Sequence, residues 1–138
     1  MLTRAVFALL VILAAPAAAA GEAKVLALGL TEHEVTEEEL AKGADLPAPR
    51  FNTGAIAYAL VAELKKGDVV EIALVKDGER LLGDSATLGE DRERFLLQAG
   101  KRGVPAGGWP DGLYHAALEI TRDGKTLIEQ SSAPIPFE

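Results

Sequence analysis

Hydrophobic and polar residues alternate one by one along most of the chain after residue 20. A period of two is typical of β-strands, because successive side chains of a strand point to opposite faces. Turn-forming residues interrupt the alternation about every eight to twelve positions, which predicts a β-sandwich or barrel. We expect about seven strands: 23–30, 55–64, 69–76, one beginning at residue 79, 92–99, 113–121 and 126–137.

The first two predicted strands each carry their larger side chains on one face. In 23–30 these are Leu26, Leu28 and Leu30, with Val25, Ala27 and Gly29 opposite. In 55–64 we expect the inward residues to be Ile56, Tyr58, Leu60, Ala62 and Leu64. The face that we expect to point outward then holds Ala55, Ala57, Ala59 and Val61.

Two Asp-Gly pairs, at Asp77-Gly78 and Asp123-Gly124, stand between strand patterns. Asp-Gly suits a type I′ turn, in which both central residues need a positive φ. Each pair therefore predicts a β-hairpin.

The segment 31–50 breaks the β pattern. Within it, Thr36-Glu37-Glu38-Glu39 matches a helix capping box, and Gly43 suits the far end of a short helix. A connection of this length between strands is unusual, so we expect it to pack over the sandwich.

The N-terminus resembles a secretory signal peptide. One base, Arg4, precedes an apolar run, Pro16 ends the run, and small residues follow from Ala17 to Gly21. The run is shorter than a bilayer crossing requires. We therefore expect residues 1–20 to be a cleaved signal peptide and 21–138 to be a single domain, periplasmic or secreted, with no membrane span after cleavage.

The charge of the predicted domain narrows its partners. Residues 21–138 carry 13 basic and 21 acidic residues, a formal charge of −8. Such a chain repels phosphate backbones and anionic lipids, so we expect no nucleic-acid partner. The sequence contains no cysteine, so disulfides cannot stabilise it.

Strand spacing and Tyr114, near the start of the penultimate strand, are similar to an immunoglobulin-like antiparallel β-sandwich with its tyrosine corner. The wider pattern resembles small bacterial exported modules that end in Trp-Pro-x-Gly-x-Tyr. The matching residues are Leu28-Gly29, Phe51, Ile56, Tyr58, Trp109, Pro110, Gly112 and Tyr114. The resemblance covers nearly all of 21–138 and implies a fold and a compartment, but no assigned activity.

An acidic loop offers one candidate for cation binding. It combines a histidine with five carboxylates: Glu32, His33, Glu34, Glu37, Glu38 and Glu39. Carboxylates attract hard cations, but no calcium-loop motif is present and solvated charge runs are common. The alternative hypothesis is thus a small-ligand or divalent-cation binding protein using loop 32–39.

Two further features suggest a binding surface. Alanine is a poor strand former, so the face of Ala55, Ala57 and Ala59 invites cover, either by segment 31–50 or by another protein. The single Trp109 is either an exposed recognition ring or, as we favour, a plug that closes one end of the sandwich.

Catalytic motifs are absent from the sequence: it has no Gly-x-Ser-x-Gly elbow and no phosphate loop. We therefore expect a protein that is not an enzyme, needs no cofactor and binds another exported or envelope protein. A small hydrolase is the less favoured alternative. The oligomeric state does not follow from the sequence.

Overall fold

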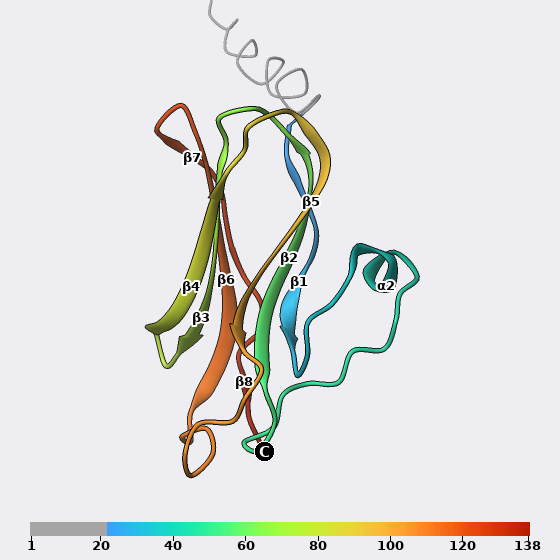
Figure 1. The fold of residues 1–138 in the computed structure, drawn as a ribbon. Helices are drawn as coiled ribbons and strands as arrows, with labels where there is room; N and C mark the ends of the chain where they lie inside the picture. Colours follow the sequence, from blue (N-terminus) through green and yellow to red (C-terminus); the bar gives the residue numbers. More distant parts are fainter. Residues whose placement is uncertain (1–21) are drawn as a thin grey trace, which may run out of the picture.

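A computed structural model describes residues 22–138. The predicted signal peptide lies outside the described residues. Within them the chain forms eight strands and one short helix (Figure 1). The elements are β1 (Lys24–Thr31), α2 (Glu37–Ala41), β2 (Ala55–Leu64), β3 (Val69–Lys76), β4 (Glu79–Thr87), β5 (Arg92–Lys101), β6 (Leu113–Arg122), β7 (Lys125–Ser131) and β8 (Ile135–Pro136).

The strands form two antiparallel sheets that face each other across one core (Figure 1). One sheet has the order β1-β2-β5 and the other β4-β3-β6-β7, with β8 also paired to β6. This confirms the predicted all-β sandwich. The immunoglobulin constant type places its fourth strand in the sheet of the first two. Here β4 pairs with β3 instead, and the immunoglobulin-like assignment stays a prediction.

The last predicted strand, 126–137, is divided into β7 and β8. The interruption contains Pro134, which has no N–H to donate to a ladder. Both pieces pair with β6, β7 along its second half and β8 at its start. The chain therefore stays beside β6 up to its C-terminal end.

The prediction for the faces of β2 was wrong. Ala55, Ala57 and Ala59 are fully buried in the core between the sheets, whereas Ile56 and Leu60 are buried on the outer side. The core cluster sets these alanines against larger side chains of β3 and β6, such as Ile72 and Leu118, so small residues on one layer make room for large ones on the other. The alanines therefore form no docking surface.

Local irregularities explain two further differences. A bulge between Val25 and Ala27 puts Val25 on the core side with Leu28 and leaves Leu26 49% exposed. At the end of β2, Glu63 has a φ of 61° and the alternation changes phase. Leu64 consequently joins the inner core, on the same side as the alanines.

The predicted turns and caps are confirmed. Both Asp-Gly pairs have positive φ at both positions, with values of 50° and 83° at Asp77-Gly78 and 53° and 76° at Asp123-Gly124. Thr36 and Glu39 form the reciprocal bonds of a capping box. Gly43, with a φ of 69°, follows the last turn, where its N–H and that of Ala44 donate back to helix carbonyls.

An aromatic cluster closes one end of the sandwich. Trp109 is 7% exposed, its Nε1 donates to the Thr53 carbonyl at 2.8 Å, and its ring packs edge-on against Tyr114 and Phe137. Tyr114 is fully buried, stacks on Phe137, and its hydroxyl donates back to the Pro110 carbonyl. The predicted tyrosine contact and the plug are confirmed, and Trp109 is not an exposed recognition ring.

A buried ion pair holds the opposite end. Asp68 is fully buried and accepts bonds of 2.8 Å from Nε and a terminal nitrogen of Arg122 and from the Lys65 N–H. Arg122, the main cause, holds the pKa of Asp68 below its ordinary value. The backbone of this turn also exchanges bonds with Leu88, so the β2–β3 and β4–β5 connections are joined here.

Candidate binding groove

The acidic loop does not assemble a cation site. Among residues 22–138, no group of three or more potential ligands is placed to hold a metal ion. Three of the predicted carboxylates have partners within the protein: Glu34 pairs with Arg102, Glu38 with Lys42, and Glu39 with the Thr36 N–H. The remaining three residues of the predicted set are Glu32, His33 and Glu37, and the metal hypothesis stays a prediction that the described residues do not support.

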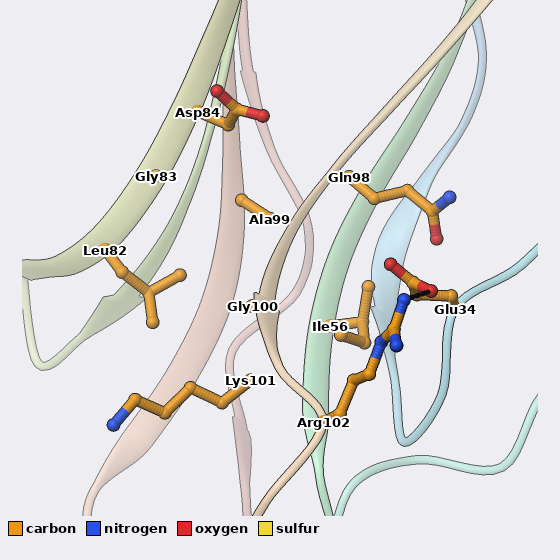
Figure 2. Close-up of a pocket in the computed structure, with 10 residues that line it drawn as sticks. All are labelled: Glu34, Ile56, Leu82, Gly83, Asp84, Gln98, Ala99, Gly100, Lys101 and Arg102. Atoms are coloured by element: carbon orange, nitrogen blue, oxygen red, sulfur yellow. Dashed lines mark hydrogen bonds and ion pairs between the residues drawn. The ribbon is translucent and has the colours of Figure 1, made fainter.

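A groove of about 380 Å³ opens instead along one side of the sandwich, between β4 and β5 (Figure 2). Leu82, Gly83 and Asp84 of β4 form one wall, and residues 98–102, from β5 and the residue after it, form the other. Ile56 and Glu34 contribute to the β5 side. The lining is mixed: besides apolar side chains it holds two carboxylates, Glu34 and Asp84, and two bases, Lys101 and Arg102.

The groove follows from the sheet topology. Within the described residues, β4 pairs only with β3, and β5 pairs only with β2, so both are edge strands of opposite sheets. They are joined by residues 88–91 at the end that Asp68 holds, and they separate toward the other end (Figure 1). The divergence of two edges therefore leaves this side of the sandwich open.

Each wall of the groove contains a glycine that allows a close approach to the neighbouring strand. A Cβ on Gly100 would lie 2.1 Å from the Ala55 carbonyl oxygen, and one on Gly83 would lie 2.8 Å from the Ile72 carbonyl oxygen. Both contacts are with backbone, which cannot yield easily. The two strands thus lie close to their paired neighbours, β2 and β3.

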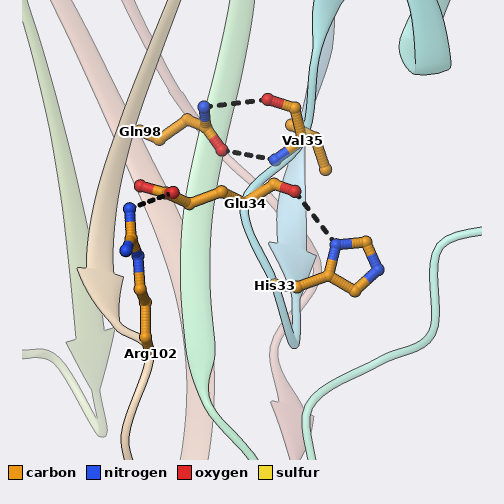
Figure 3. Close-up of polar contacts among 5 residues, drawn as sticks. All are labelled: His33, Glu34, Val35, Gln98 and Arg102. Carbon is orange, nitrogen blue, oxygen red and sulfur yellow. Dashed lines mark hydrogen bonds and ion pairs between the residues drawn. The ribbon is translucent and has the colours of Figure 1, made fainter.

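The connection 32–54 is fixed to the outer side of β5 beside the groove (Figure 3). The Gln98 side chain accepts from the Val35 N–H at 2.8 Å and donates to the Val35 carbonyl at 3.0 Å, and Val35 itself is buried. Arg102 forms an exposed ion pair with Glu34. These contacts define one rim of the groove and fix the start of the connection to the outer face of β5, whereas α2 buries no residue. The connection does not cover the alanines, which face the other sheet.

The fold and the groove define the chain as a β-sandwich with one open side. No protein-family model matches the sequence, and no curated protein is similar to it. In the part of the chain that the structure describes, no helix has the length and apolarity needed to cross a membrane.

Sequence reasoning singled out none of the β4 and β5 residues that line the groove. One signal was present: four bases, Arg92, Arg94, Lys101 and Arg102, occur within eleven residues of an acidic chain, beside a single acid, Glu93. Local charge reversal of this kind marks a surface that differs from the rest of the molecule.

Proposed function

We propose that this chain is a non-catalytic binding domain that holds an extended segment of another exported or envelope protein in the groove between β4 and β5. The observation that carries the proposal is that two unpaired strand edges border one groove. The proposal includes export of the domain to the periplasm or beyond, as the N-terminal pattern predicts.

Strand edges have a defined chemical complement. Each presents N–H and C=O groups that only water satisfies in the free protein, at the spacing of a β-ladder. An extended peptide supplies the matching donors and acceptors and adds a strand to the sheet. Leu82 and Ala99 in the walls then offer apolar contacts to alternate side chains of that peptide.

Site-specific photo-crosslinking tests this function. A photoreactive residue at Asp84 faces the groove, and one at Asp123 lies in an exposed turn outside it. We expect crosslinks in the producing cell to form from position 84 and not from position 123. Equal crosslinking from both positions, or none from position 84, would contradict the proposal.

Amide hydrogen exchange provides the second readout. Edge amides of β5 and β4 that face the groove exchange with solvent when they are unpaired, and strand addition protects them. We expect a crosslinked or purified partner to slow exchange in residues 92–101. Protection confined to the β7 edge would place the partner elsewhere.

A further inference from the structure

The two groove edges differ in regularity. The pairing of β5 with β2 keeps one register from Ala55 opposite Lys101 to Leu64 opposite Arg92. The pairing of β4 with β3 is interrupted, which leaves Leu81 outside the register and 41% exposed. Bulges of this kind bend an edge and hinder further pairing. The regular edge of β5 is therefore the better template for an added strand.

The β5 edge is also positive in a negative protein. Residues 92–102 hold four bases and one acid, whereas residues 22–138 as a whole carry eight more acids than bases. Arg102 pairs with Glu34, and Arg92 lies over the Phe95 ring at 5.5 Å. Within the described residues no ion pair engages Arg94 or Lys101, and both are exposed. Two bases thus stand near opposite ends of the edge.

The middle of the same edge is apolar. Phe95, Leu97 and Ala99 face the space between the sheets. Of these, Ala99 lines the groove, with Leu82 on the other wall. Lys101, two residues after Ala99, follows on the same side and extends toward β4 (Figure 2). An added strand would meet apolar side chains at its centre, Lys101 on the core side at one end, and Arg94, on the opposite face of β5, at the other end.

We infer that the segment bound by β5 is acidic: an extended stretch of about eight to ten residues with alternating apolar side chains in its middle and Asp or Glu at its ends. This inference rests on the proposed function and names the chemistry of its partner. Opposite charges across neighbouring strands stabilise pairing, and like charges oppose it. A second copy of β5 does not fit, because either orientation would set bases against bases.

Two synthetic peptides test the charge of the segment. Both carry three Thr-Val repeats, flanked by Glu-Glu at each end in one and by Lys-Lys in the other. We expect fluorescence polarisation to show binding of the acidic peptide, with affinity falling as salt rises, and no binding of the basic one. The overall negative charge of the protein favours the reverse order, so preference for the basic peptide, or binding of neither, overturns the inference.

Charge reversal at the edge supplies the matched variants. The double variant Arg94→Glu, Lys101→Glu should lower the affinity for the acidic peptide at least tenfold. The control, Lys42→Glu with Lys125→Glu, makes the same change in net charge away from the groove and should change that affinity less than twofold. All four side chains are exposed, so we expect both variants to fold, and thermal denaturation checks this. Equal weakening by both variants would attribute binding to bulk charge and overturn the inference.

Bases on edge strands also prevent self-association. If the edge variant forms concentration-dependent oligomers and the unmodified protein binds neither peptide, the bases protect the edge and the inference fails. Sequencing of the peptide crosslinked from position 84 tests the acidic character of the bound segment separately from the proposed function. A crosslinked partner segment without acidic residues would preserve the proposed function and refute its acidic chemistry.

Discussion

The Asp68–Arg122 ion pair provides the sharpest test of what holds the sandwich together. Asp68→Asn keeps the shape of the side chain and removes its charge. An NH₂ group then replaces one of the two oxygens that accept from Arg122 at 2.8 Å, so one charge-assisted bond becomes a contact between donors. The Lys65 N–H can still donate to the remaining oxygen.

The magnitude follows from burial. A hydrogen bond to a charged group contributes about 1.5–3 kcal/mol, and breaking one side of a fully buried pair costs about 3–5 kcal/mol. The Asp68 side chain is 1% exposed, but that of Arg122 is 25% exposed and can turn toward water. We therefore expect Asp68→Asn to lower the free energy of unfolding at pH 7 by about 2–3 kcal/mol, measured by urea denaturation.

The pH dependence has a defined sign. The pKa of Asp68 is lower in the folded protein than its ordinary value of 3.8, chiefly because of the Arg122 bond. Its contribution to stability is complete above the unfolded pKa and is lost as pH falls through the folded one. The difference in the free energy of unfolding between the unmodified protein and Asp68→Asn should thus stay constant from about pH 7 to 5 and become smaller below about pH 4.

Two results would refute this reasoning: a difference under about 0.5 kcal/mol at pH 7, which is ordinary for surface substitutions, or one that does not narrow in acid. Glu38→Gln is the control. It breaks the pair with Lys42, in which both side chains are more than 70% exposed, and should leave stability unchanged.

Three further predictions concern stability at pH 7. Tyr114→Phe leaves the Pro110 carbonyl without its donor and should cost about 1–3 kcal/mol in chemical denaturation, whereas an unchanged midpoint would disprove the tyrosine contact. Ala57→Arg forces a charge into the closed core and should cost about 4 kcal/mol or more, so a wild-type melting curve would contradict the inward orientation of the alanines. Glu119→Gln should raise stability by about 0.2–1 kcal/mol, because Glu119 lies opposite Glu71 on the neighbouring strand, and a lower melting temperature would show that this repulsion is negligible.

Patterns that act locally were sufficient for much of the fold. Period-two alternation located the strands, and Asp77-Gly78 and the Thr36 box located a turn and a helix, because each depends on neighbours within a few residues. The orientation of β2 could not be predicted from neighbouring residues. Both of its faces are buried, so large residues such as Ile56 and small ones such as Ala57 both lie away from water, and side-chain size does not reveal which face meets the other sheet.

The groove could not be predicted from local sequence patterns, for a related reason. It exists because β4 and β5 end as edges of different sheets and then diverge, and that depends on which strands pair. The bulge that exposes Leu26 is similarly set by the pairing of β1 with β2. Only the basic residues of 92–102 marked the region in the sequence.

The contact between Gln98 and Val35 has a consequence for the order in which the chain assembles. The side-chain amide of Gln98 accepts from the N–H of Val35 and donates to its carbonyl, as a peptide group in an adjacent strand would, across 63 positions of sequence. This docking place comes into being only when β5 has joined β2. Closing so long a loop is entropically costly, so we expect the pairing of β2 with β5 to come first and residues 32–35 to bind the finished sheet late in folding.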